Sequence, residues 1–195
     1  MPRQNPTSSH CSAALALDLL GDRWVLLLIR EVVFGTRRFD DFADHLDIAR
    51  NVLTQRLAKL VAAGVLMQVP LEKEGRRQGY HLSEMGKDLM PVLVALMQWG
   101  DRWLQTADSV PLRLIERSTG ASIPRLLPRN AAGEELTMQD IDWAPGPGAS
   151  HPAIAPLVRA YEAQRRVVPR PVPVATKPRP TSPFKTPRPR KVSTP

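Results

Sequence analysis

The sequence has little cysteine, few aromatic residues and no long apolar run. Its one cysteine, Cys11, excludes a disulfide within the chain and a metal site made of several thiolates, and it suits a reducing compartment. The longest purely apolar runs, Trp24 to Ile29 among them, are far short of the roughly 20 residues that span a bilayer. Residues 1–10 are polar and lack the apolar core of a signal peptide. We therefore expect a cytoplasmic protein, associated with the nucleoid if it binds DNA.

Positive charge is concentrated near the C-terminal end of the sequence. The formal net charge is +8, and from Arg159 onward ten Lys or Arg accompany one acid, Glu162, so residues 1–158 carry a charge near −1. Nine of the 27 residues from Pro169 onward are proline. Such a segment cannot bury enough apolar surface to offset the ordering of its backbone. We expect a tail that either binds a polyanion such as DNA non-specifically or only keeps the protein in solution.

Apolar periodicity predicts a mainly α-helical domain with a small β-hairpin, of the winged helix-turn-helix class. Helices are expected at residues 11–20, 23–34, 39–46, 49–63 and 84–105, with Asp22 as the cap of the second, and a further short helix at 153–167. Strands are expected at 65–71 and 80–82, and in a later appendage at 112–115 and 126–127. The second helix is apolar nearly all round and should be buried, and Pro91 should kink the last one near its start. The predicted segments are a disordered N-terminus at 1–10, this domain at 11–105, a short β-rich appendage at 110–144, and a linker with a disordered tail at 145–195.

The helix expected at 49–63 has the features of one that enters a DNA groove. Leu53, Leu57 and Leu60 share one face, which should contact the core. No acid occurs between Ile48 and Leu71, so the opposite face would tolerate the phosphates beside a groove. An ordinary surface helix would also carry a polar face, so the pattern alone leaves both interpretations open. The residues expected to read base edges or contact phosphates are Arg50, Asn51, Thr54, Gln55, Arg56 and Lys59.

The hairpin between the two expected strands has a basic tip. Its residues 75–79 read Gly-Arg-Arg-Gln-Gly, and the glycines permit a close turn. Arg76 and Arg77 are able to enter a minor groove or contact phosphates. Glu72 and Glu74 flank the tip and weaken the case, and a tip of this kind is also compatible with simple solvation. Two helices joined by a tight turn and followed by such a hairpin nevertheless favour DNA binding.

Five segments resemble, in order, the HxlR-type family of winged helix-turn-helix transcriptional regulators. They are Ala16–Trp24, Gly35–Phe39, Asn51–Leu57, Tyr80–Gly86 and Trp99–Trp103. The resemblance covers residues 11–104 and adds Arg38 to the expected DNA-binding residues. It implies a homodimeric DNA-binding regulator, often a repressor, that responds to oxidants, electrophiles or a small metabolite. In several relatives a cysteine near the N-terminus is the sensor, which implies the same role for Cys11. Its thiol would lie at a helix start, where the helix dipole stabilises a thiolate. The alternative is that Cys11 is a small packed apolar residue with no chemical role.

A dimer is also expected from the apolar residues themselves. The last helix carries a stripe that a domain of this size cannot bury alone, and pairing it with the first helix across a twofold axis would cover it. The two reading helices would then lie about one DNA turn apart and would require a palindromic operator. The alternative is that the stripe packs against the core of its own monomer and forms no interface. The expected interface residues are Leu15, Leu19, Leu89, Leu93, Leu96, Trp99 and Trp103.

Other functional classes have less support in the sequence. The appendage resembles a ribbon that in some relatives carries zinc-binding cysteines, but no thiolate stands at the comparable places here, so no metal or cofactor is expected. The sequence has no phosphate-binding glycine loop and no nucleophile motif, so we do not expect an enzyme. The alternative to a sequence-specific regulator is an architectural DNA-binding protein of weak specificity, driven by its basic tail.

Overall fold

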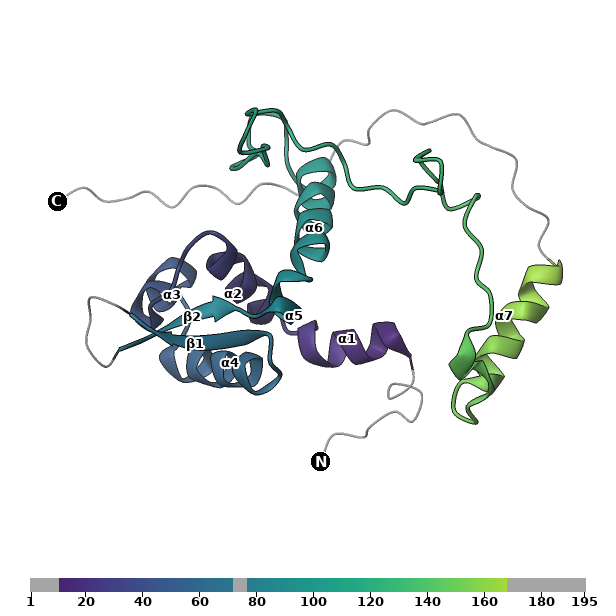
Figure 1. The fold of residues 1–195 in the computed structure, drawn as a ribbon, viewed down its shortest axis with the longest axis horizontal. Coiled ribbons are helices and arrows are strands. Elements are labelled where there is room, and N and C mark those ends of the chain that lie inside the picture. The colour runs from purple at the N-terminus through teal and green to yellow at the C-terminus, as the bar shows by residue number, and fades with distance from the viewer. Residues whose placement is uncertain (1–10, 72–76, 168–195) are drawn as a thin grey trace. The chain divides into compact units, whose positions relative to one another are not determined.

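The computed structural model describes residues 11–71 and 77–167, with side chains up to Gln164 (Figure 1). The chain divides into two compact units, one containing residues 11–90 and 141–167 and the other residues 91–140. The predicted disorder of residues 1–10 and of the basic tail falls outside the described residues. Among the helices that are described, none is long and apolar enough to cross a membrane.

The first two helices meet at a sharp junction. Helix α1 (Ser12–Leu20) ends at Gly21, whose backbone N–H donates to the carbonyl oxygen of Leu17 at 2.7 Å. A Cβ atom on Gly21 would lie 2.5 Å from that same oxygen, so any other residue would force a shift. Helix α2 (Arg23–Val33) then begins at Asp22, which caps it by accepting a hydrogen bond from the backbone N–H of Trp24 at 2.9 Å. The predicted cap is confirmed.

Helices α2, α3 (Phe39–Leu46) and α4 (Arg50–Ala62) enclose the core of this unit. The ring of Phe42 is fully buried and meets Tyr80 edge to face, with the ring centroids 5.9 Å apart. The predicted burial of the second helix is confirmed, since it supplies a third of the core cluster. The buried apolar residues of that cluster are Val25, Leu28, Ile29, Val32, Phe42, Ala43, Ile48, Leu53, Leu57, Leu60, Val65 and Leu66.

A tight turn joins α3 to α4, as predicted. Asp47 adopts the left-handed conformation with φ 48°, which aspartate tolerates better than most residues do. The next residue, Ile48, is buried in the core and anchors the turn. The direction of α4 is therefore fixed by the left-handed turn at Asp47, which lies between the packed helix α3 and the buried side chain of Ile48.

The hairpin consists of β1 (Leu66–Pro70) and β2 (Gln78–Leu82), which pair antiparallel with Leu66 opposite Leu82 (Figure 1). The predicted tip at 75–79 was too long, because Gly79 lies within β2. A Cβ on Gly79 would come within 2.6 Å of the Leu71 side chain, so this glycine permits close packing within the hairpin. Residues 72–76, including Arg76, lie outside the described part.

The single helix predicted at residues 84–105 is in fact two helices. Helix α5 (Glu84–Lys87) begins at Ser83, whose Oγ accepts a hydrogen bond from the Gly86 N–H at 3.1 Å. The chain leaves the helix at residues 88–89 and resumes as α6 (Met90–Trp103). Pro91 explains the break, because it lacks an N–H and its ring would clash with the carbonyl four residues earlier. The predicted kink is thus a full interruption.

The second unit continues from α6 into two short hairpins. Isolated bridges close them, Ile115 with Ser122 and Arg129 with Glu135. The β-rich appendage expected here therefore has little regular sheet, and the strand expected at residues 126–127 is irregular chain. Residues 141–167 belong to the first unit and contain the short helix η2 (Pro147–Ser150) and α7 (Ala155–Val167), close to the helix predicted at 153–167.

Candidate DNA-binding site

Helix α4 has one buried apolar face and one exposed polar face, as predicted. Leu53, Leu57 and Leu60 are at most 1% exposed and fix the helix to the core. Asn51, Thr54 and Gln55 are exposed on the other side. The exposed face thus carries an amide, a hydroxyl and a second amide on a helix whose position is set by its buried leucines.

Two of these side chains make only local hydrogen bonds. The Asn51 carbonyl oxygen accepts from the backbone N–H of Val52 at 2.9 Å, and the Thr54 hydroxyl donates to the carbonyl oxygen of Arg50 at 2.8 Å. Neither bond uses the amide donors of Asn51 or the lone pairs of the Thr54 oxygen. Such donors and acceptors match the base edges of a major groove.

Arg50 lies at the start of α4 and contacts α3. Its guanidinium forms an ion pair with Asp40 at 2.8 Å and lies over the ring of Phe39, 5.7 Å from the ring centroid. Both charged side chains of the pair are more than half exposed. An exposed pair of this kind contributes about 0–1 kcal/mol to stability, so a phosphate could replace Asp40 at little cost.

Arg56 and Lys59 fasten α4 to the junction between α1 and α2. The Arg56 guanidinium contacts the Asp22 carboxylate at 2.7 Å, and the Lys59 ammonium donates to the carbonyl oxygens of Asp18 and Leu19 at 2.8 and 3.1 Å. Both residues flank the buried leucines of α4. Their expected contacts with phosphates stay a prediction, and their observed role is to hold the helix in place.

Asp22 joins α2 and α4 at this junction. One carboxylate oxygen caps α2 and the other binds Arg56 of α4. Partial burial opposes the charge, but the hydrogen bond from Trp24 and the Arg56 guanidinium outweigh it and lower the pKa of Asp22. The charged form of Asp22 is therefore the one that links α2 to α4.

The remaining candidate arginines lie near the turn into α3 and in the hairpin. Arg38 is half-buried and occupies the residue before α3. Arg77 is exposed at the start of β2, and its carbonyl oxygen accepts from the Leu71 N–H at 2.9 Å. Both arginines take part in further interactions within the protein. Their contacts with DNA stay predictions, as does that of Arg76.

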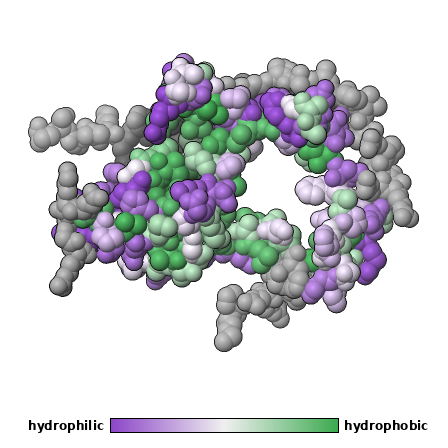
Figure 2. Space-filling model, in the orientation of Figure 1, coloured by the Kyte–Doolittle hydropathy of each residue, from purple (hydrophilic) through white to green (hydrophobic). Residues whose placement is uncertain are grey.

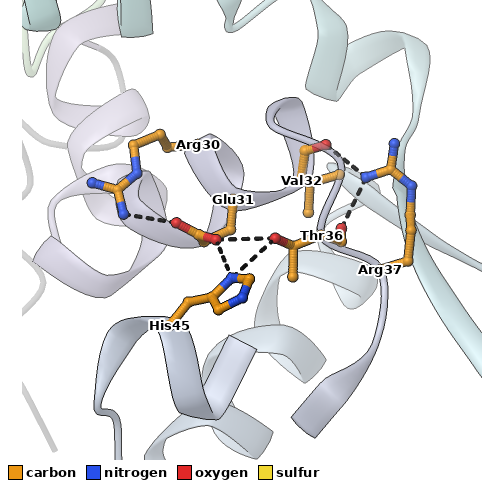
Figure 3. A network of polar contacts seen from close by, with 6 residues as sticks. All are labelled: Arg30, Glu31, Val32, Thr36, Arg37 and His45. Atoms are coloured by element: carbon orange, nitrogen blue, oxygen red, sulfur yellow. Dashed lines mark hydrogen bonds and ion pairs between the residues drawn. The ribbon is translucent and has the colours of Figure 1, made fainter. Parts of the chain in front are cut away.

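Sequence reasoning missed a buried acid on α2. Glu31 is 7% exposed and binds Arg30 at 2.7 Å, His45 at 2.9 Å and Thr36 at 3.0 Å (Figure 3). Burial would raise the pKa of Glu31, but these three hydrogen bonds outweigh burial and lower it. The network links α2 to α3. The only acid of a mostly apolar helix, next to Arg30, was the signal that could have revealed it.

Arg37 was also missed as a structural residue. Its guanidinium donates to the carbonyl oxygens of Val32 at 2.6 Å and Thr36 at 2.8 Å, at the C-terminal end of α2 (Figure 3). Its own carbonyl oxygen accepts a hydrogen bond from the Tyr80 N–H at 2.9 Å. Arg37 therefore attaches β2, and with it the hairpin, to the buried helix.

The residues expected at a dimer interface differ in exposure. Leu15, Leu96 and Trp99 are each about half exposed, at 50%, 47% and 53%. Trp103 is half-buried, Leu93 is buried, and Leu19 and Leu89 pack against the core of the first unit. Figure 2 shows apolar side chains gathered over α1 and along α6.

Cys11 occupies the position before α1. The residue is half-buried, and its carbonyl oxygen accepts from the Leu15 N–H at 2.9 Å. Its role as a sensor stays a prediction. In the part of the chain that the structure describes, no three His, Cys, Asp or Glu side chains group as metal ligands.

Comparison with known proteins decides the family. The sequence profile of the HxlR-like helix-turn-helix family matches residues 19–108. The chain is also 41% identical over 138 residues to Rv3095 of Mycobacterium tuberculosis, an HTH-type transcriptional regulator. The match covers 70% of this chain and 87% of Rv3095. The chain belongs to the HxlR-like helix-turn-helix family. The expected resemblance is confirmed, and this HxlR-like chain is a DNA-binding transcriptional regulator.

Solved structures agree with the fold of this HxlR-like protein. The crystal structure of PA1607, described as a candidate transcription factor, superposes with a TM-score of 0.67 at 36% identity, over 73% of this chain and all of that one. A second, PA1374 from Pseudomonas aeruginosa, gives 0.53 at 33% identity, over 75% and 99%. Both matches extend well past residue 105, so the fold beyond the winged helix has counterparts in other proteins.

Proposed function

We propose that this regulator is a sequence-specific repressor that binds a palindromic operator as a homodimer. In this proposal α4 enters the major groove and reads base edges with Asn51, Thr54 and Gln55. Arg50 contacts a flanking phosphate, and the hairpin with Arg77 follows the neighbouring backbone or minor groove. The observation that carries the proposal is the exposed, acid-free polar face of α4, set on a helix whose other face is buried.

The surroundings of α4 support a reading role over simple solvation. A reading helix must be held rigidly, because base-edge hydrogen bonds depend on distance and angle. The Asp22 pair with Arg56 and the two carbonyl contacts of Lys59 provide that rigidity on the flank of the helix. Arg37 does the same for the hairpin.

The homodimer is supported by exposed apolar side chains on two helices. Leu15 on α1, and Leu96 and Trp99 on α6, expose about half of their surface. Large apolar side chains left exposed on a helix often mark an interface. A twofold pairing would cover these residues and present two copies of α4 to one duplex.

The test replaces Asn51 and Gln55 together by alanine. The operator is first obtained by selecting bound duplexes from a random library. We expect the wild-type protein to prefer it about 10³-fold over random DNA, and the double variant to lose most of that preference, since each bidentate base contact contributes about 1–3 kcal/mol. Fluorescence anisotropy at fixed salt measures both affinities.

A matched control replaces Gln139, an exposed glutamine of the appendage, by alanine. This control should bind the operator like the wild-type protein. Undiminished selectivity in the Asn51 and Gln55 double variant, with an unchanged circular dichroism spectrum, would remove α4 from the reading role.

The architectural alternative is favoured by the ten basic residues from Arg159 onward. In that case selection from random duplexes yields no consensus, and deleting residues 169–195 flattens the salt dependence of binding. A response to oxidants or electrophiles through Cys11 is a separate question. It is tested by comparing operator binding of the wild-type protein and Cys11→Ser after treatment with diamide.

A further inference from the structure

A shallow cavity of about 430 Å³, wide open to solvent, lies between α6 and the appendage. It falls entirely within the unit of residues 91–140 and has the size of a small-molecule site. Its lining joins two arginines, an acid and an amide with three apolar side chains. These residues are Gln98, Asp101, Arg102, Ala107, Val110, Ile123 and Arg125.

One glutamine holds the two walls of this cavity together. The Gln98 side chain on α6 donates to the carbonyl oxygen of Pro124 at 3.1 Å and accepts from the backbone N–H of Leu126 at 2.8 Å. These two bonds lie on either side of Arg125 in the chain. They therefore fix the backbone of Arg125 against α6. Arg102 lies one helical turn beyond Gln98 on the same helix.

The chemistry of the lining favours an anion with an apolar body. The lining contains two arginines, Arg102 and Arg125, and one carboxylate, that of Asp101, so the cavity carries a net positive charge. Guanidinium groups bind carboxylates through paired, charge-assisted hydrogen bonds. Ala107, Val110 and Ile123 offer apolar surface to the remainder of a ligand. We propose that this cavity binds a small organic carboxylate.

The site lies mostly on a different face of α6 from the apolar stripe. At 100° per residue, Gln98 and Asp101 fall opposite Leu96, whereas Arg102 borders the stripe, with its guanidinium carbon 5.2 Å from the ring centroid of Trp103. A bound carboxylate would therefore occupy the side of α6 next to the appendage and leave Leu96 open for a second subunit. An effect on operator affinity rests on the proposed function, whereas binding of the carboxylate does not.

Isothermal titration calorimetry of the full-length protein tests the site with three carboxylates of increasing size, acetate, benzoate and 1-naphthoate. Each is paired with its neutral amide of nearly the same shape. We expect at least one carboxylate to bind tenfold or more tightly than its amide. Arg125→Gln should lower the affinity for that carboxylate about tenfold, and Arg102→Gln should do the same.

Arg117→Gln is the matched control, because Arg117 is an exposed arginine of the same unit that does not line the cavity. It should bind the carboxylate as the wild-type protein does, and it reports how far the loss of any single positive charge lowers the affinity. Equal affinities for acid and amide, equal loss in the control, or no binding by any of the three acids would overturn the proposal. None of these results depends on DNA, so a failed operator selection is distinguishable from a failed ligand site.

Discussion

Two regions of this regulator, the winged helix and the chain beyond α6, are stabilised in different ways. The winged helix has a core of fully buried side chains from three helices and the hairpin. In contrast, every described residue from Asp101 to Gln164 is at least partly exposed. The first region is therefore stabilised by the hydrophobic effect and should unfold cooperatively, whereas the chain beyond α6 depends on turns, local hydrogen bonds and the anchor at Gln98.

Polar contacts show the same contrast. In the winged helix they join distant parts of the chain. Arg56 binds Asp22, 34 residues away, and His45 binds Glu31, 14 residues away. In the appendage the ion pair of Arg129 with Glu135 spans six residues. Long-range contacts contribute to global stability, while short-range ones mainly order a single turn.

The largest expected effect comes from the core. Phe42→Ala should lower the free energy of unfolding by about 3–5 kcal/mol, because Phe42 is fully buried and loses its contact with Tyr80. Met138→Ala in the appendage, where the side chain is 81% exposed, should change it by less than about 0.5 kcal/mol. Urea denaturation followed by circular dichroism measures both, and similar costs would show that the two regions are not built differently.

Much of the winged helix was predictable, because it follows from periodicity and capping. The leucines of α4 and the Asp22 cap identify their positions without tertiary information. The break before α6 was only partly visible, since Pro91 signals a disturbance but not whether the helix kinks or stops. The appendage has few periodic residues, so its irregular hairpins could not be deduced.

The outward face of α4 was predictable, but the partners of its flanking cations were not. Arg56 and Lys59 have long side chains, and sequence spacing does not show which distant group they reach. Their partners, Asp22 and two carbonyl oxygens at the end of α1, become neighbours only when the chain folds. The network of Glu31 was missed for the same reason.

An intermediate effect is expected from removing a long-range ion pair. Asp22→Ala should cost about 1–2 kcal/mol, because it removes both the cap of α2 and the partner of Arg56. Glu135→Ala removes an ion pair of the same length, 2.7 Å, in the appendage. Its effect on urea denaturation should be close to zero, and a loss equal to that of Asp22→Ala would contradict the contrast between long-range and short-range contacts.

The smallest effect, and the sharpest comparison, concerns the pH dependence of two glutamates. Hydrogen bonds lower the pKa of both carboxyl groups. At Glu31, burial would raise the pKa, but hydrogen bonds from Arg30, His45 and Thr36 outweigh it. At exposed Glu116, hydrogen bonds from Thr119 and Ser118 lower the pKa. A carboxyl with a lowered pKa in the folded state stabilises it fully above its ordinary value of 4.5, and this contribution is lost as the pH falls through the folded value.

Glu31→Gln should therefore be less stable than the wild-type protein near neutral pH, and the difference should shrink as the pH falls below about 4.5. Glu116→Gln should leave the pH dependence of global unfolding unchanged, because its partners lie within three residues in a turn outside the core. Urea midpoints measured between pH 7 and pH 3 compare the two variants. If Glu116→Gln altered the pH dependence of the urea midpoint as much as Glu31→Gln does, the appendage would unfold together with the winged helix. The exposure of a residue would then be a poor guide to whether its region unfolds cooperatively with the core.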